Sequence, residues 1–233
     1  MGQAVCRRLA RDGMAIGVLD INEDNAAKVA EQIVQSNGKA LAVKADLADR
    51  PEVDTAVAKV REELGPIEVL VNAAGIEGYA PFEELSLDAW ERVIAVNLTG
   101  AFNAVQAVLP DMRQAKYGRI VFVSSSSGQT GNPWMAGYAS SKGGVIALTK
   151  SLAMELGPMG ITVNSVSPGF IDTPMAQRAI STQEHIVLDD LLKTFPVQRM
   201  GTSEEIAAAC AYLVSEEAGY TNGQILGVNG GIV

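Results

Sequence analysis

Short apolar runs alternate with longer stretches of helical periodicity along almost the whole chain. The apolar runs are continuous, which is typical of strands buried on both faces of a parallel sheet. We expect strands at 15–20, 40–46, 67–73, 119–125, 161–167 and 224–230. Helical spacing covers 23–36, 50–63, 86–115, 138–157 and 203–215. The alternation predicts an α/β fold: one domain, residues 1–233, with a doubly wound parallel sheet and helices on both faces.

A further helix is expected at the start of the chain, before the first predicted strand. Val5, Leu9 and Ala10 fall on one face of this stretch, and Gly13 follows its end. A helix that leads directly into a strand resembles the middle of a βαβ unit. The order of elements therefore raises the question of what precedes Met1.

The longest irregular stretch, 168–202, follows the fifth predicted strand. Ligands bind at the carboxyl ends of the strands in open α/β sheets, and long connections in compact domains are often lids. We expect a substrate lid at about 172–202 that contains one or two short helices.

Composition narrows the class of partner. The chain has 233 residues, a formal net charge of -9 and a pI near 4.7, which argues against nucleic acid and against an anionic membrane. We find no apolar run approaching 18 residues and no signal-peptide layout. Cys6 and Cys210 lie far apart in helical patterns, which indicates two reduced, buried thiols in a cytoplasmic protein.

Candidate chemistry centres on Tyr138 and Lys142, which stand four residues apart in YASSK at the start of a predicted helix. Both side chains should project from one helix face, although such a pair alone is usually just helix surface. Ser125 follows a buried strand thirteen residues earlier, and Asn97 lies in the helical stretch VNLTGAF. The sequence NAAG, residues 72–75, ends another strand. Because of these neighbouring motifs, the Tyr138–Lys142 pair indicates a catalytic site and not only helix surface.

With these motifs the chain resembles the classical short-chain dehydrogenase/reductase family over about its whole length. NAAG is similar to the family's NNAG, VNLTG to its Asn-bearing helix segment, YASSK with the upstream serine to its Ser–Tyr–Lys set, and SPGFIDTP to its PG motif. The resemblance implies a Rossmann-like fold and hydride transfer between a nicotinamide cofactor and a secondary alcohol or ketone.

The resemblance assigns catalytic roles that suit the side chains. Tyr138 would be the general acid and base, and an ammonium at Lys142 would lower its pKa from the free value near 10. Ser125 would donate to the carbonyl oxygen of the substrate. Lys142 would also hydrogen-bond the nicotinamide ribose. Asn97 would break its helix locally and position a water that relays protons to Lys142.

The run of four serines leaves one alternative. Ser126 is one residue away from Ser125, and such a shift at a strand end points the side chain to the other face. With Ser125 as the donor, Ser126, Ser127 and Gln129 would line the substrate pocket or make ordinary turn hydrogen bonds.

The cofactor preference is read from Asp20, which ends the first predicted strand. A carboxylate there accepts hydrogen bonds from an adenosine ribose and repels a 2′-phosphate. Ile21 and Asn22 supply no positive charge, so NAD(H) is expected over NADP(H). Asp20 could instead cap the next helix, although Asn22 or the acids that follow it could do so.

The remaining cofactor contacts are implied by the family pattern. Asp46 would meet the adenine amino group beside Leu47, and Ala73 replaces the second Asn of NNAG. Ile171 would meet the nicotinamide carboxamide through its backbone, and Thr173 would reach the amide or a phosphate. The expected cofactor set is Gly2, Asp20, Ile21, Asp46, Leu47, Asn72, Ala73, Gly75, Tyr138, Lys142, Pro168, Gly169, Ile171 and Thr173.

The family pattern also carries a first strand and a glycine-rich turn, TGxxxGxG, and Gly2 matches the last glycine of that turn. Glycine there lets backbone N–H groups and a helix N-terminus approach the pyrophosphate. That strand normally lies between those at 15–20 and 67–73, and without it two strand edges are exposed. Either Met1 is internal to a longer protein, or the chain starts there and NAD binds weakly.

We therefore expect an NAD(H)-dependent alcohol dehydrogenase or ketoreductase; the alternatives are a catalytically silent subunit or binding module, and a 3-oxoacyl thioester reductase. The resemblance implies a homotetramer formed through 98–115, 138–157 and a second interface near the C-terminal strand. Trp134, Met135, Met175 and Ile180 suggest a partly apolar pocket. His185 is expected in solvent on the lid, so no metal site is expected.

Overall fold

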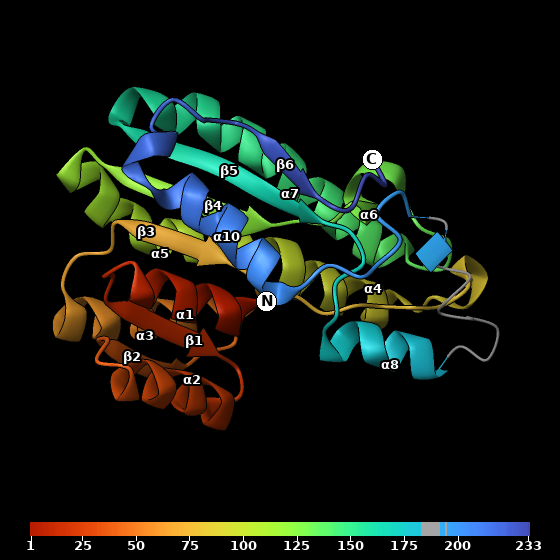
Figure 1. The fold of residues 1–233 in the computed structure, drawn as a ribbon, viewed down its shortest axis with the longest axis horizontal. Helices are drawn as coiled ribbons and strands as arrows, with labels where there is room; N and C mark the ends of the chain where they lie inside the picture. The colour runs from red at the N-terminus through yellow and green to blue at the C-terminus, as the bar shows by residue number, and fades with distance from the viewer. Residues whose placement is uncertain (183–191, 194) are drawn as a thin grey trace.

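Parallel strands form two groups in the computed structural model, which describes residues 1–182, 192–193 and 195–233. In one sheet β1 (Ile16–Asp20) pairs with β2 (Ala40–Lys44). The other sheet has the order β3 (Val69–Asn72), β4 (Gly118–Val123), β5 (Ile161–Pro168) and β6 (Ile225–Val228). Helices cover both faces (Figure 1). The predicted fold class is confirmed, and every predicted strand is present with its ends shifted by at most two residues.

The sheet is interrupted between β1 and β3. Figure 1 shows their arrows pointing in the same direction, and among the described strands neither has a partner on the side facing the other. These are the two strand edges that we expected from the sequence to be exposed. In contrast, every residue of β4 and β5 is buried, as expected for strands covered by helices on both faces.

Most helices begin and end close to their predicted positions. The bounds are α1 (Gly2–Arg11), α2 (Glu23–Gln35), α3 (Arg50–Leu64), α4 (Leu87–Ile94), α5 (Gly100–Ala115), α7 (Ala136–Leu156) and α10 (Ser203–Val214). Asn22 caps α2, because its Oδ1 accepts a hydrogen bond from the N–H of Asn25 at 3.0 Å. Asp20 is therefore not needed as the cap of that helix.

The stretch predicted as one helix at 86–115 contains a π-helical turn at Ala95–Thr99, between α4 and α5. The local break expected at Asn97 is present. By length and composition Leu87–Ala115 could cross a membrane, although no single apolar run had suggested this. Its apolar window is 56% buried inside the fold, which is what a core helix of a folded domain also shows.

Several short elements are not visible in the periodicity. They are the 3-10 turns Phe82–Glu84, Gly157–Met159 and Glu216–Ala218 and the short helix α6 (Ser127–Thr130). The helix α8 (Pro174–Thr182) lies in the region expected to form a lid. Residues 183–191 and 194, including the predicted lid position His185, lie outside the described residues.

Candidate active site

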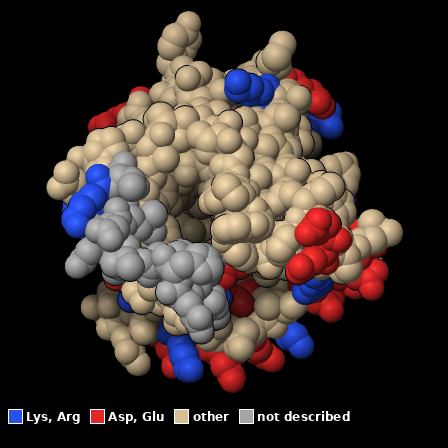
Figure 2. All heavy atoms as spheres, turned by 90° about the vertical axis from the view of Figure 1, so that its right-hand side faces the viewer, with Lys and Arg blue, Asp and Glu red and all other residues tan. Residues whose placement is uncertain are grey.

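The carboxyl ends of the strands meet at one edge of the molecule. Asp20 ends β1, Asn72 ends β3, Ser124 and Ser125 follow β4, and Pro168 ends β5. Figure 2 views the molecule from this edge and shows a hollow near the centre of the visible face. The topology thus brings the predicted catalytic and cofactor residues to the same side.

Ser125, and not Ser126, is the serine that reaches Tyr138. The Ser125 side chain is buried, its Oγ accepts the N–H of Ser127 at 3.2 Å, and its hydroxyl hydrogen-bonds Tyr138. The N–H of Ser126 instead donates to Pro168 O at 2.9 Å, so this residue anchors α6 to the end of β5. The geometry therefore favours Ser125 over its neighbour.

Lys142 is buried at 5% exposure, below the ring of Tyr138. Its Nζ lies 5.8 Å from the ring centroid and donates a hydrogen bond to Val123 O at 2.8 Å. Burial disfavours the ammonium form and lowers the pKa of Lys142 to about 8. This lysine is therefore poised to change its charge close to neutral pH.

The pKa of Tyr138 differs from expectation. Burial raises it, the hydrogen bond from Ser125 partly offsets that rise, and the negative charge of Glu77 raises it further. The protonated phenol is thus the favoured form. Lys142 Nζ donates to the Val123 carbonyl, and the lowering of the Tyr138 pKa by Lys142 stays a prediction.

Asn97 joins the π-helical turn to the loop after β3. Its Oδ1 accepts the N–H of Ile76 at 2.8 Å, and its Nδ2 donates to Ile76 O at 2.9 Å and to Ser141 Oγ at 3.0 Å. A Cβ on Gly75 would lie 3.2 Å from both Asn97 Oδ1 and Lys142 Nζ. The loop passes this close because residue 75 has no side chain. The proton relay through Asn97 stays a prediction.

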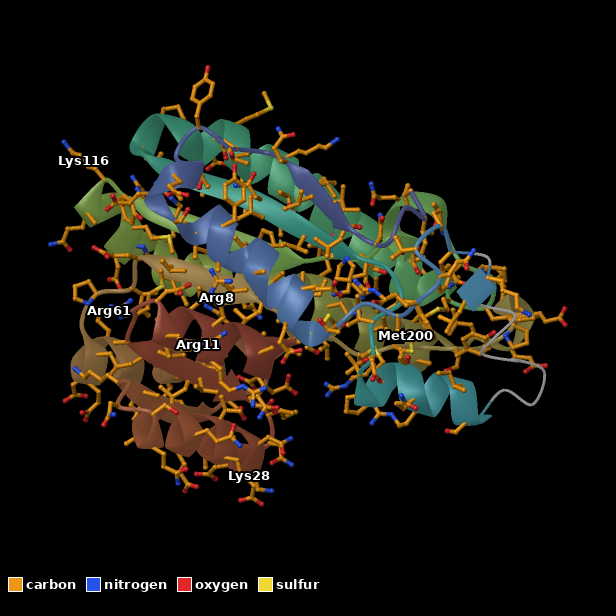
Figure 3. All side chains as sticks on the ribbon, viewed as in Figure 1. Arg8, Arg11, Lys28, Arg61, Lys116 and Met200 are labelled. Carbon is orange, nitrogen blue, oxygen red and sulfur yellow. The ribbon has the colours of Figure 1, made fainter. Side chains whose placement is uncertain are left out.

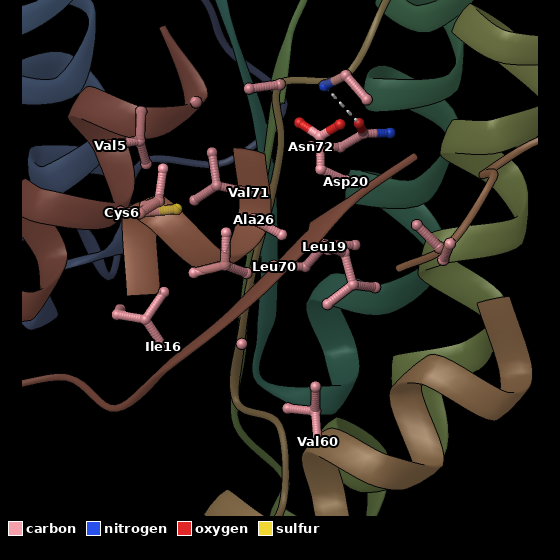
Figure 4. Close-up of a pocket in the computed structure, with 18 of the residues that line it drawn as sticks. Val5, Cys6, Ile16, Leu19, Asp20, Ala26, Val60, Leu70, Val71 and Asn72 are labelled. Carbon is pink, nitrogen blue, oxygen red and sulfur yellow. Dashed lines mark hydrogen bonds between the residues drawn. The ribbon is translucent and has the colours of Figure 1, made fainter. Parts of the chain in front are cut away.

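Many of the predicted cofactor residues share one cavity of about 1130 Å³. Those that line it are Gly2, Asp20, Ile21, Asp46, Leu47, Asn72, Ala73 and Gly75. Figure 4 shows Asp20 and Asn72 at the same end of this cavity, with Ile16 and Val60 farther along it. The structure therefore brings these candidates together, whereas their binding of a cofactor stays a prediction.

The other cofactor candidates form the segment that follows β5. A Cβ on Gly169 would meet Asn229 O at 2.7 Å, so this glycine permits a close backbone crossing beside Pro168. Ile171 bridges to Gly201, and Thr173 Oγ1 accepts the N–H of Ala176 in the first turn of α8 at 3.3 Å. These contacts hold the segment in place.

Three charged residues near the site are absent from the sequence prediction. Arg92 on α4 forms an ion pair with Asp46 at 3.4 Å. The two residues are so far apart in the sequence that no sequence pattern indicates this pair. Lys28 on α2, labelled in Figure 3, lines the same cavity as Asp20. Glu77 lies two residues after Gly75 and acts on Tyr138 through its charge. The one sequence signal that could have identified Glu77 is its position just after NAAG.

Trp134, one of the residues predicted for the substrate pocket, packs against Tyr79, whereas the pocket itself stays a prediction. The rings of Tyr79 and Trp134 have centroids 5.6 Å apart, and the N–H of Ala80 donates to Trp134 O at 2.8 Å. Met135 is half-buried next to this pair. Within residues 1–182, 192–193 and 195–233, no group of three or more His, Cys, Asp or Glu residues could hold a metal ion.

Comparison with known proteins places the chain in a family. The family model described as Enoyl-(Acyl carrier protein) reductase matches residues 1–233. Acetoacetyl-CoA reductase of Cupriavidus necator is 39% identical, over 100% of this chain and 93% of that protein.

Two solved structures of similar fold carry nicotinamide cofactors. NAD+-bound xylitol dehydrogenase has a TM-score of 0.94 and 33% identity, over 98% of this chain and 93% of its own. Gluconate 5-dehydrogenase from Burkholderia cenocepacia, in complex with NADP and tartrate, has a TM-score of 0.91 and 33% identity, over 97% and 88%. The protein is therefore an oxidoreductase that belongs to the classical short-chain dehydrogenase/reductase family.

Proposed function

We propose that the protein is an NAD(H)-dependent oxidoreductase that interconverts a secondary alcohol and a ketone, with Tyr138 as general acid and base. The observation that carries this proposal is the Ser125–Tyr138 hydrogen bond above the buried Lys142. In ketone reduction the alkoxide that develops must receive a proton, and a protonated phenol held at the carbonyl supplies it.

Each of the predicted catalytic residues has its own role in this reaction. Ser125 donates to the carbonyl oxygen and holds it near Tyr138. Tyr138 gives its proton to that oxygen in reduction and takes it back in oxidation. Lys142 places a positive charge beneath the phenol, and this charge stabilises the phenolate that is left after proton transfer. Asn97 positions the loop at Ile76 through two hydrogen bonds.

The residues present fit a nicotinamide dinucleotide, which when bound supplies or accepts the hydride. Gly75 leaves space that a Cβ would fill beside Lys142 Nζ. The carboxylate of Asp20 is exposed at the mouth of the cavity and is available to ribose hydroxyls. Asp46 and Leu47 would meet the adenine, and Lys142 would hydrogen-bond the nicotinamide ribose.

The preference for NAD(H) rests on Asp20, and it predicts the effect of changing that residue. Asp20→Ala should raise kcat/KM with NADPH relative to NADH by roughly tenfold or more, about 1.4 kcal/mol, because the carboxylate no longer repels a 2′-phosphate. Lys28 remains in the cavity wall and attracts that phosphate. Steady-state kinetics with both cofactors measure the change.

Two variants control this experiment. Lys28→Ala added to Asp20→Ala should remove much of the gain with NADPH. Asp24→Asn removes a nearby acid that does not line the cavity and should leave the cofactor ratio unchanged. Equal ratios for Asp20→Ala and the unchanged protein would contradict the assignment of Asp20.

The pH dependence of ketone reduction should follow Lys142. Since burial lowers the pKa of Lys142 to about 8, its charge is present below that pH and lost as pH rises through it. Tyr138, whose pKa is raised, stays protonated over this range. We therefore expect kcat/KM for reduction to decline above about pH 8.

Arginine at position 142 provides the control for the pH profile. A guanidinium stays charged throughout the range, so Lys142→Arg should lose the decline near pH 8 even if its overall rate is low. A decline at the same pH in both proteins would assign it to a different group.

The substrate class has two candidates from similar proteins. Acetoacetyl-CoA reductase acts on a 3-oxoacyl thioester, whereas xylitol dehydrogenase acts on a polyol. We favour a small secondary alcohol or ketone, because Glu77 sets a negative charge near Tyr138 and would accept hydrogen bonds from substrate hydroxyls. A panel of acetoacetyl-CoA, polyols and cyclic ketones with both cofactors tests this choice. If NADH does not bind at millimolar concentration, the result favours the alternative of a catalytically silent subunit.

We also propose a homotetramer in the cytoplasm. Phe102 on α5 and Met154 on α7 are 45% and 82% exposed, and Leu226 on β6 is 37% exposed, which supports subunit contacts on these elements. Cys6 and Cys210 are free, as expected in a reducing compartment. Light scattering on the purified protein tests the assembly.

A further inference from the structure

The short helix α6 connects Ser125 to the helix that carries Tyr138. It begins two residues after Ser125, has four residues and packs along α7 (Figure 1). A helix of one turn has little stability of its own, because nucleation of the first turn is unfavourable. The position of α6 therefore depends on its contacts with the rest of the fold.

The Ser125 hydroxyl is bound directly to this helix. Its Oγ accepts the N–H of Ser127, the first residue of α6, at 3.2 Å, and its hydroxyl hydrogen-bonds Tyr138. Because the N–H of Ser127 occupies one lone pair of Oγ, the hydroxyl hydrogen is directed away from α6. A shift of α6 would therefore change the direction in which Ser125 donates.

The side chain of Gln129 joins α6 to the carboxyl end of β5. Its Oε1 accepts a hydrogen bond of 2.8 Å from the hydroxyl of Ser167, a residue 38 positions farther along the chain. The turn before α6 is held by the next residue of β5, because Pro168 O accepts the N–H of Ser126 at 2.9 Å. Two adjacent residues of β5 thus bind the start and the later part of α6.

Burial makes the hydrogen bond from Ser167 hard to replace. The exposure of Ser167 is 0%, and a buried hydroxyl that loses its partner is unfavourable. Gln129 is exposed, yet its side-chain oxygen is held by this buried group. At Gly128 the helix lies against the backbone of α7, so α6 is in close contact with α7 and bound to β5.

We propose that Gln129 and Ser167 are positioning residues, whose hydrogen bond holds α6 where the Ser127 N–H orients the Ser125 hydroxyl toward Tyr138. They act through Ser125. The expected effect on the rate rests on the proposed function, whereas the placement of α6 can be measured without turnover.

Removal of either partner tests this hydrogen bond. Gln129→Met keeps the length of the side chain and removes the acceptor, and Ser167→Ala removes the donor. Each should lower kcat for ketone reduction roughly three- to tenfold, with NADH binding unchanged by fluorescence. The double variant should be no slower than the slower single variant, because the second change removes a group that has already lost its partner.

The pH dependence of alcohol oxidation reports on Ser125 itself. In that direction Tyr138 accepts a proton, so the rate rises as the phenol ionises, and the hydrogen bond from Ser125 lowers the pKa of Tyr138. In Gln129→Met and Ser167→Ala the rise should move to higher pH by roughly half a unit or more. Glu77 and Lys142, the charged groups near the phenol, stay in place.

Two variants on α6 are the matched controls. The Thr130 hydroxyl bonds the carbonyl groups of Ser126 and Gly131 within the same turn, so Thr130→Val should leave kcat and the pH profile unchanged. Gln129→Glu keeps an oxygen that accepts from Ser167 and should retain most of the activity that Gln129→Met loses. A lower kcat with an unmoved pH profile, or additive losses in the double variant, would overturn the proposal.

Amide hydrogen exchange measures the placement of α6 without a substrate. Exchange of the Ser127 N–H should accelerate roughly three- to tenfold in Gln129→Met and not in Thr130→Val, because this N–H is held by Ser125 Oγ. Equal exchange in Gln129→Met and the unchanged protein would contradict the role of Gln129. Faster exchange in a protein that reduces no ketone would support this placement of α6 and count against the proposed function.

Discussion

Replacement of Tyr138 by phenylalanine is expected to abolish turnover while NADH still binds. The change removes only the hydroxyl that meets Ser125, and the ring keeps its place above Lys142. Since general acid catalysis contributes about 10²–10⁴-fold, kcat should fall by at least that range. Stopped-flow or steady-state assays of ketone reduction measure the rate, and NADH fluorescence measures binding.

The serine pair gives a matched control for the tyrosine variant. Ser125→Ala removes the donor to Tyr138 and should lower kcat strongly. Ser126→Ala removes a hydroxyl of the same kind one residue away and should have a small effect. Full activity of Tyr138→Phe, or an equal loss in the two serine variants, would contradict the proposed reaction.

An alanine at Gly128 should damage both stability and activity. A Cβ there would lie 2.7 Å from the carbonyl carbon of Lys142 and 2.8 Å from the N of Gly143, both in the backbone of α7. Neither atom can move aside as a flexible side chain would, so α6 must shift away from α7. We expect a loss of about 1–3 kcal/mol in the free energy of unfolding and a lower kcat.

Gly137, the second residue of α7, is the control for this substitution. A Cβ on Gly137 would meet only an ordinary contact, 3.5 Å from the ring of Trp90. Alanine forms helices more readily than glycine, so Gly137→Ala in the first turn of α7 should not lower stability. Urea unfolding followed by circular dichroism compares the two variants. Equal midpoints would show that α6 adapts to the extra methyl group.

The strands could be predicted because continuous apolar runs are typical of strands that are buried on both faces of a sheet. The runs at 119–125 and 161–167 became β4 and β5, in which every residue is buried. Short elements such as α6 escaped prediction because four residues give too little periodicity. The stretch 86–115 has helical periodicity throughout and was predicted as one helix, whereas a π-helical turn at Ala95–Thr99 separates α4 from α5.

The positions of the site residues were more predictable than their electrostatics. Spacing alone put Tyr138 and Lys142 on one helix face, and the structure also brings Ser125 to them. The pKa of Tyr138 could not be read in this way. It depends on burial, on the hydrogen bond with Ser125 and on the charge of Glu77, all of which are tertiary properties. The Asp46–Arg92 pair likewise joins residues far apart in the chain.

The contact between α1 and α10 has a consequence for the two cysteines. Cys6 lies on α1 and Cys210 on α10, and both belong to the core region where these helices pack. Burial raises the pKa of Cys6 to about 11 and that of Cys210 to about 12, so almost no thiolate forms at neutral pH. Cys210 is fully buried, whereas Cys6 is half-buried and lines the cavity. A thiol reagent will therefore reach Cys210 mainly when α1 separates from α10, so the labelling rate of Cys210 measures the opening of that contact.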